Sequence, residues 1–330
     1  MNNLLILADG GNSIGFGHIM RCLAIKGCWR HGSATLLVQM KGGGKAPGDA
    51  INYNWLDHIE TLKRFTTKNT SLLVDSYLTN ALHFKQLKEI FPFITVLDDY
   101  NRMVYPVDLI ICPGVYGKDI NYSNQVANTY GGPEYVIIRP EILALPKIEL
   151  NETVNSVLVT LGGSQKNIQV FQMIVDIFEN KNYQLIVVTG SNQLAKKIRS
   201  KKAKIYGELD RKSMSTIMAN TDIAITSAGQ TINEFAWLGV PLLSIKTGED
   251  QHYNWVYYNQ YVLSTTSSSE KLNETILTFI KYDTYSKRQK TSNELKGLLT
   301  PTGANLICST IQDFKGINDE SCRTHNCSTP

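Results

Sequence analysis

The chain has 330 residues, of which 42% are hydrophobic and 19% are charged, and its formal net charge is +4. This length allows two domains of roughly 150 residues each, and the composition is that of a globular protein rather than a disordered one. The charge is too small to indicate a nucleic-acid partner and suits a small anionic ligand. No apolar stretch reaches the roughly 18 residues of a membrane-spanning helix.

The termini and the cysteines indicate a cytoplasmic location with reduced thiols, and we expect a monomer. The N-terminus lacks the basic region and the length of a signal peptide, and the six cysteines show no framework spacing. Cys322, His325 and Cys327 cluster near the C-terminus. A protein metal site usually needs four ligands in a fixed geometry, so a frayed polar tail is the simpler interpretation. We therefore expect no metal and no cofactor.

Apolar runs alternate with amphipathic helical patterns in chain order. The first half predicts strands at residues 4–8, 35–39, 71–75, 94–98, 109–112 and 135–138, with helices at 19–29 and 80–90. The second half predicts strands at 156–160, 184–189, 204–205, 223–226 and 241–245, with helices at 167–178, 194–200, 211–219, 231–237, 270–280, 287–299 and 302–314. Short Val/Ile/Leu strands alternating with helices indicate parallel sheets covered on both faces.

The proline-containing, polar segment at 139–155 reads as a connection between two such domains. We expect an N-terminal Rossmann-like domain at 1–145, a linker at 146–155, a C-terminal Rossmann-like domain at 156–315 and a flexible tail at 316–330. Open parallel sheets bind ligands outside the carboxyl ends of their strands. Two such sheets facing each other would form one deep interdomain cleft.

The loop after the first predicted strand combines glycines with a histidine. Gly15 and Gly17 let the backbone approach a ligand closely. His18 stands where the next helix begins and can exchange a proton near neutral pH. Arg21, one turn further, either supports a phosphate or pairs with a carboxylate.

Polar and small residues follow several other strands. Asp75, Tyr77, Asp98 and Asp99 stand at strand ends in the first half. Asp98 and Asp99 either are structural, capping loops or pairing with Arg102, or hold a sugar hydroxyl. In the second half, Gly162, Gly163 and Ser164 form one glycine loop, and Ala228, Gly229, Gln230 and Thr231 open a helix that carries Glu234. Backbone amides at such positions bind phosphate. For the loop of residues 162–164, a plain tight turn without a ligand is an equal alternative. Glu234 either accepts ribose hydroxyls or serves as a capping carboxylate.

These motifs, taken in order, are similar to one family. The run from Ala8 to Arg21 resembles the opening signature of the UDP-2,4-diacetamido-2,4,6-trideoxy-β-L-altropyranose hydrolases of pseudaminic acid biosynthesis, with Leu7 in place of an arginine. Further matches are residues 74–77, 97–99, 132–141, 161–164 and 228–234. Ser76 stands where the family has a histidine, and Asp250 stands where it has an asparagine.

The resemblance implies a fold and a reaction. It implies the two-domain GT-B fold of the MurG-type glycosyltransferases and metal-independent cleavage of a UDP-sugar by water. His18 would be the general base, and Tyr77, Asp250 and Gln251 would orient the sugar. The loops around Gly162 and Gly229 would hold the diphosphate, and Glu234 the ribose. The expected partner is therefore a small UDP-sugar, with no integral membrane segment.

Two other functions stay open on the same residues. A UDP-sugar glycosyltransferase would use His18 to deprotonate an acceptor hydroxyl instead of water. A non-catalytic nucleotide-sugar binding protein would keep the loops without turnover, and the departures at Ser76 and Asp250 leave room for it.

Overall fold

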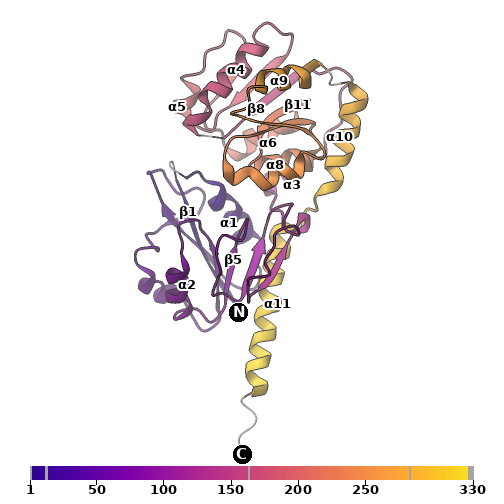
Figure 1. Ribbon diagram of the computed structural model, residues 1–330. Coiled ribbons are helices and arrows are strands. Elements are labelled where there is room, and N and C mark those ends of the chain that lie inside the picture. The colour runs from indigo at the N-terminus through magenta and orange to yellow at the C-terminus, as the bar shows by residue number, and fades with distance from the viewer. Residues whose placement is uncertain (1, 12–13, 163, 282–283, 326–330) are drawn as a thin grey trace, which may run out of the picture. The chain divides into compact units, whose positions relative to one another are not determined.

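The computed structural model describes residues 2–11, 14–162, 164–281 and 284–325, with side chains described as far as Lys315. The chain divides into two compact units, which are described separately (Figure 1). The first unit comprises residues 1–137 and 301–330, and the second comprises residues 138–300. The chain therefore passes between the units twice.

The first unit is a parallel seven-stranded sheet with the order β3-β2-β1-β4-β5-β6-β7. Its strands are β1 (Asn3–Gly10), β2 (Ala34–Met40), β3 (Ile51–Asn52), β4 (Thr70–Asp75), β5 (Ile94–Leu97), β6 (Leu109–Cys112) and β7 (Asn128–Gly131). The helices are α1 (Gly17–Cys28), α2 (Ala81–Lys88) and α11 (Gly303–His325), with 3₁₀ turns η1 (Ile59–Phe65) and η2 (Pro133–Tyr135).

The second unit is a parallel six-stranded sheet with the order β10-β9-β8-β11-β12-β13. Its strands are β8 (Ser156–Thr160), β9 (Gln184–Val188), β10 (Lys204–Tyr206), β11 (Ile223–Ser227), β12 (Leu242–Lys246) and β13 (Leu263–Thr266). The helices are α3 (Pro140–Leu143), α4 (Ile168–Phe178), α5 (Asn192–Ala195), α6 (Arg211–Ala219), α7 (Thr231–Leu238), α8 (His252–Tyr258), α9 (Leu272–Lys281) and α10 (Tyr285–Leu298), with 3₁₀ turns η3 (Gln165–Asn167) and η4 (Glu249–Gln251).

These two sheets confirm the predicted α/β class. The central strands β1, β4, β8 and β11 are buried over nearly their whole length because helices cover both faces of each sheet. Capping side chains and glycines set the residues at which the helices begin and end. Asn80 caps α2 by accepting from the amides of Leu82 and His83, and Gly239 ends α7 in the left-handed conformation at φ +81°.

One predicted strand is wrong. Residues 135–138 form no strand, because Pro133 starts the 3₁₀ turn η2 and the chain then leaves the sheet. The edge position is taken by β7 instead. The sequence pattern missed β7 because its side chains are mostly exposed and alternate with no apolar face.

The domain boundaries also differ from those expected. Residues 146–155 pack within the second unit, where the Ile148 amide donates to the Leu238 carbonyl at 2.9 Å. Residues 303–315 pack on the first unit and not on the second. The helix α11 continues to His325, so residues 316–325 are helical rather than a frayed tail. Residues 326–330, and the side chains of Cys322 and His325, lie outside what the structure describes.

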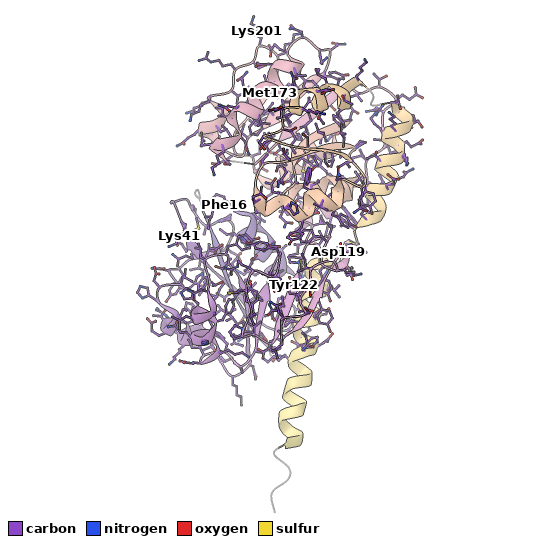
Figure 2. All side chains as sticks on the ribbon, in the orientation of Figure 1. Phe16, Lys41, Asp119, Tyr122, Met173 and Lys201 are labelled. Carbon is purple, nitrogen blue, oxygen red and sulfur yellow. The ribbon has the colours of Figure 1, made fainter. Side chains whose placement is uncertain are left out.

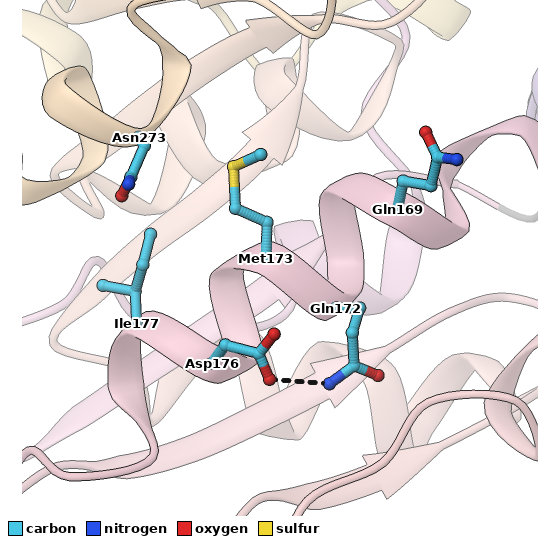
Figure 3. Close-up of a pocket in the computed structure, with 6 residues that line it drawn as sticks. All are labelled: Gln169, Gln172, Met173, Asp176, Ile177 and Asn273. Carbon is cyan, nitrogen blue, oxygen red and sulfur yellow. Dashed lines mark hydrogen bonds between the residues drawn. The ribbon is translucent and has the colours of Figure 1, made fainter.

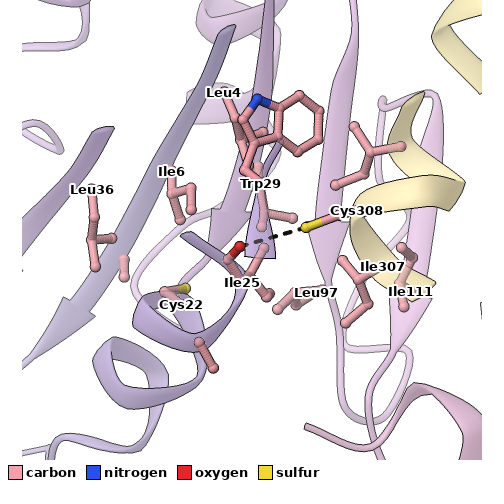
Figure 4. Packing of buried hydrophobic residues seen from close by; sticks show 14 of the residues in the cluster. Leu4, Ile6, Cys22, Ile25, Trp29, Leu36, Leu97, Ile111, Ile307 and Cys308 are labelled. Atoms are coloured by element: carbon pink, nitrogen blue, oxygen red, sulfur yellow. Dashed lines mark hydrogen bonds between the residues drawn. The ribbon is translucent and has the colours of Figure 1, made fainter. Parts of the chain in front are cut away.

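The anchor of α11 is the apolar core beside α1. Ile307, Cys308 and Ile311 are buried there, and the Cys308 thiol donates to the Ile25 carbonyl at 3.5 Å (Figure 4). Among the described residues, no helix has the length and apolarity to span a membrane.

This packing predicts that the last helix stabilises the first unit. Replacing the fully buried Ile311 by Ala should lower the free energy of unfolding by about 2–5 kcal/mol, because the removed methyl groups leave a cavity. The matched control is Asn305→Ala on the exposed side of the same helix. Urea denaturation measures both, and equal stability of the two variants would contradict this packing.

Candidate functional site

In the first unit, the candidate site lies where the strand order diverges. β1 and β4 are neighbours, with β2 beyond β1 and β5 beyond β4. In open parallel sheets, ligands bind outside the carboxyl ends of the strands at such a point. The loop of residues 10–17 follows β1, and residues 76–80 follow β4. Figure 2 shows Phe16 and Lys41, which follow β1 and β2, at one end of this unit.

His18 is held by a buried carboxylate. Its Nδ1 lies 2.6 Å from Oδ1 of Asp75, the last residue of β4. An ionised carboxylate only accepts hydrogen bonds, so Nδ1 is the donor and carries the proton. The neutral imidazole then has its acceptor at Nε2. This is the arrangement that a general base requires.

The charges around His18 favour its protonated form. Burial disfavours the imidazolium, but the Asp75 carboxylate outweighs burial and raises the pKa of His18 above its ordinary value of 6.5. The pKa of Asp75 shifts the opposite way: burial would raise it, but Arg21 and His18 hold it well below its usual range. Asp75 is therefore ionised wherever the protein is folded at neutral pH.

Arg21 clamps two carboxylates. Its Nε and Nη2 lie 2.5 Å from the two oxygens of Asp75, and its Nη1 and Nη2 lie 2.8 Å and 2.9 Å from the oxygens of Asp99. Arg21 is only 7% exposed. Its planar fork is thus engaged on both sides. Of the two interpretations from sequence, the contacts support pairing with carboxylates and leave no free donor edge for a phosphate.

Tyr77 contacts both Asp99 and His18. Its hydroxyl donates to Asp99 Oδ2 at 2.5 Å, and its ring meets the His18 ring edge-on with 4.5 Å between centroids. Burial and the Asp99 carboxylate raise the pKa of Tyr77 far above its ordinary value. Tyr77 therefore stays protonated and can orient a ligand but cannot act as a base.

The remaining aspartates at this edge support loops. Asp98 accepts from the hydroxyls of Tyr105 at 2.6 Å and Tyr122 at 2.8 Å, so its role is structural. Asp9 Oδ2 accepts from the Ser76 hydroxyl at 2.5 Å and the Leu78 amide at 3.1 Å. Within the described part of the chain, its Oδ1 is buried and has no hydrogen-bond partner.

The glycines of the first loop keep the space beside His18 open. Gly15 has φ +88°, a conformation that favours glycine. A Cβ added at Gly15 or Gly17 would meet nothing within 4 Å. The loop is closed by amide–carbonyl bonds between Gly11 and Gly15 at 2.8 Å and 2.9 Å.

The second unit repeats this topology around β8 and β11. The order diverges between these two strands, so the loop of residues 161–165 and the start of α7 share one edge. Gly162 has φ +78° and open space where a Cβ would stand. Gly163 lies outside the described residues. The Ser164 side chain accepts from the Lys166 amide at 3.4 Å and starts η3.

The start of α7 offers fewer amides than the sequence suggests. The Ala228 amide already donates to the Ile245 carbonyl at 3.2 Å, so it is not available to a ligand. Gly229, Gln230 and Thr231 hold the first amides of the helix, which have no partner within the helix.

Two further candidates, Asp250 and Gln251, lie in η4. The Gln251 side chain accepts from the Thr247 amide at 3.0 Å, and its Nε2 lies 3.9 Å from a Cβ built on Gly229. Gln251 thus joins the same edge as the first turn of α7. Asp250 is exposed, and its Oδ1 lies over Gly248.

Glu234 has a protein partner that the sequence did not reveal. Both of its carboxylate oxygens accept from Arg139, at Nε and, with a distance of 2.7 Å, at Nη2. Both side chains are largely buried. Each oxygen keeps a second lone pair, so a ribose hydroxyl could still bind there. No cluster of His, Cys, Asp and Glu suited to a metal occurs among the described residues.

The grooves of the surface lie elsewhere. One of 510 Å³ runs between α4 and α9 and is lined by Gln172, Met173 and Asn273 among others (Figure 3). Another, of 730 Å³, lies beside β7. None of the residues discussed for the two sheet edges, Tyr122 apart, lines either groove.

Comparison with known proteins agrees with this architecture. Residues 156–297 match the glycosyltransferase family 28 C-terminal domain. The structure of Acinetobacter baumannii MurG superposes with a TM-score of 0.58 at 12% identity, covering 95% of this chain and 100% of that one. This superposition shows that the chain has the two-domain GT-B fold, as predicted.

Two curated relatives match about three quarters of the chain. A Helicobacter pylori protein named "Pseudaminic acid cytidylyltransferase and UDP-2,4-diacetamido-2,4,6-trideoxy-beta-L-altropyranose hydrolase" is 26% identical over 74% of this chain and 44% of its own length. The Bacillus subtilis spore coat polysaccharide biosynthesis protein SpsG is 25% identical over 74% of this chain and 78% of its own. The chain thus spans less than half of the Helicobacter protein.

The contact between His18 and Asp75 predicts a pH dependence. Because folding raises the pKa of His18, protonated His18 stabilises the fold at low pH, and this contribution is lost as the pH rises through the folded pKa. Asp75→Asn should lower the pKa of His18, since burial then acts without the carboxylate. NMR titration of the imidazole measures it, with Asp108→Asn as the control. An unchanged midpoint in Asp75→Asn would contradict the assignment.

The ion pair of Arg139 and Glu234 predicts a stability effect in the second unit. Arg139→Ala should destabilise that unit by about 3 kcal/mol, because it leaves a largely buried carboxylate without its partner. The double variant Arg139→Ala/Glu234→Gln should recover part of the loss. Thermal or urea unfolding measures both, and no recovery would argue against the pair as the cause.

Proposed function

We propose that this chain is a nucleotide-sugar hydrolase of glycan biosynthesis. The proposed substrate is a UDP-linked diacetamido-trideoxyhexose, cleaved by water to UDP and the free sugar in the formation of a pseudaminic-type acid. The observation that carries the proposal is the His18–Asp75 pair beside Tyr77, at the edge where an open parallel sheet binds ligands. The curated relatives and the ordered sequence motifs support the choice of substrate.

The chemistry follows from the acceptor at His18 Nε2. A water oxygen attacks the anomeric carbon while Nε2 takes one of its protons. The bond between the anomeric carbon and the diphosphate oxygen breaks, and UDP leaves with the bonding electrons. Asp75 stabilises the imidazolium that forms, through its 2.6 Å hydrogen bond to Nδ1.

The nucleotide is assigned to the second unit. Amides around Gly162 and at the first turn of α7 would neutralise the leaving diphosphate, and Glu234 would accept from the ribose. Gln251 and the exposed Asp250 of the same unit are assigned to the sugar. The proposed cytoplasmic location follows from the nucleotide-sugar substrate.

Removing the base should separate binding from turnover. His18→Ala or His18→Phe should lower kcat by about 10²–10⁴-fold and leave UDP affinity unchanged, because UDP is assigned to the second unit. Calorimetry with UDP and a UDP-release assay measure the two quantities. His58→Ala, an exposed histidine of the same unit, is the control. Full activity of the His18 variants would contradict the assignment of His18 as the general base.

A glycosyltransferase is the second candidate, because residues 156–297 match a glycosyltransferase domain. On this alternative, His18 would deprotonate an acceptor hydroxyl. The purified protein and a panel of UDP-sugars decide between the two: UDP release without any acceptor supports the hydrolase, and strict dependence on an added acceptor supports the transferase. Tight UDP binding with no turnover of any UDP-sugar would favour a binding protein.

A further inference from the structure

The contacts of Tyr77 fix the direction of its only hydroxyl hydrogen. Asp99 is buried, and although burial opposes its ionisation, Arg21 lowers its pKa below the ordinary value. An ionised carboxylate has no hydrogen to donate. The 2.5 Å contact between Tyr77 Oη and Asp99 Oδ2 is therefore a bond donated by Tyr77. Toward a ligand, the half-buried Tyr77 oxygen has only lone pairs left.

His18, like Tyr77, presents a hydrogen-bond acceptor to a ligand, but for a separate reason. In the neutral imidazole, its Nδ1 proton points to Asp75, which leaves Nε2 as an acceptor. The two rings contact each other edge-on, with 4.5 Å between centroids. Two adjacent groups therefore accept hydrogen bonds, and a carboxylate sets the polarity of each. Arg21 holds both carboxylates in place.

We propose that Asp99 and Arg21 are positioning residues that make Tyr77 an obligate acceptor, so that Tyr77 Oη and His18 Nε2 bind the two hydrogens of the attacking water. This inference rests on the proposed hydrolase function. Water satisfies both acceptors because it has two O–H groups, whereas an alcohol has one and leaves one acceptor unpaired. The pair thereby selects water over an acceptor hydroxyl as the nucleophile. The proton on Nε2 comes from water, and the second hydrogen stays on the new sugar hydroxyl.

The ratio of two products tests this selection. With a UDP-sugar substrate in water containing methanol, the wild type should form free sugar in large excess over methyl glycoside. Tyr77→Phe should raise the ratio of methyl glycoside to free sugar by about tenfold, because only water loses a hydrogen bond. Asp99→Asn should raise it in the same direction, and adding it to Tyr77→Phe should bring no further change. A product ratio does not depend on how much folded enzyme is present.

The control is another tyrosine–aspartate pair of the same unit. Tyr105 donates to Asp98 at 2.6 Å in the same manner, but away from His18. Tyr105→Phe should leave the product ratio unchanged. An unchanged ratio in Tyr77→Phe, with hydrolysis intact, would overturn the proposal. Independent, additive effects of Asp99→Asn and Tyr77→Phe would also overturn it.

A second measurement does not require turnover. Tyr77 is faced by His18, Asp99, Tyr100 and Arg102. In protein labelled at the tyrosine ring carbon that bears the hydroxyl, the NMR signal of Tyr77 should show no ionisation up to pH 10.5. It should begin to ionise there in Asp99→Asn. Ionisation of Tyr77 in the wild type below pH 10.5 would overturn the role of Asp99. If Tyr77 stays protonated but the protein hydrolyses no UDP-sugar, the proposed function is refuted, together with the water selection that rests on it.

Discussion

The bidentate grip of Arg21 on Asp75 and Asp99 is the constraint on which the first site depends. Two ionised carboxylates at adjacent strand ends would repel each other, and each would lose its hydration on burial. One guanidinium between them, with contacts of 2.5–2.9 Å, offsets both costs. Because Arg21 lies one turn after His18 on α1, the same helix carries the proposed base and the cation that holds its carboxylate partner. The ion pairs thus determine which nitrogen of His18 is free and which way the Tyr77 hydroxyl points.

Strand order brings these groups together. Asp9 is the next-to-last residue of β1, Asp75 is the last residue of β4, and Asp99 follows β5. These three strands are neighbours in the sheet although far apart in sequence. Parallel strands all end at the same edge, so three aspartates meet where α1 begins. In the second unit the same topology places the glycine loop after β8 beside the first turn of α7. The two units therefore offer one kind of edge with two chemistries: titratable groups in the first, and backbone amides in the second.

The sequence was sufficient for the central strands and the glycine loops, because their Val/Ile/Leu runs and glycines are local signals. It was not sufficient where the pattern is weak or the partner is distant. β7 and β13 are short edge strands. The side chains of β7 are mostly exposed and those of β13 are mostly polar, so no apolar alternation marks either strand. Arg21 could not be told from a phosphate ligand, because its partners lie 54 and 78 residues away and only the strand order identifies them. For the same reason, the sequence could not identify Arg139 as the partner of Glu234.

The two departures from the hydrolase-like motifs differ in their consequence. Ser76 stands in place of a histidine, but its hydroxyl is directed to Asp9, and Ser76 is 3% exposed. Ser76 therefore supports the loop after β4. It takes no part in the contacts among His18, Asp75 and Tyr77. The other carboxylate oxygen of Asp9, Oδ1, is buried without a partner in the described chain. Asp250, by contrast, is exposed in η4 beside Gln251. Ser76 leaves the contacts among His18, Asp75 and Tyr77 intact, and Asp250 places a carboxylate at an exposed position. On the proposed function, these departures favour an altered sugar over a lost reaction.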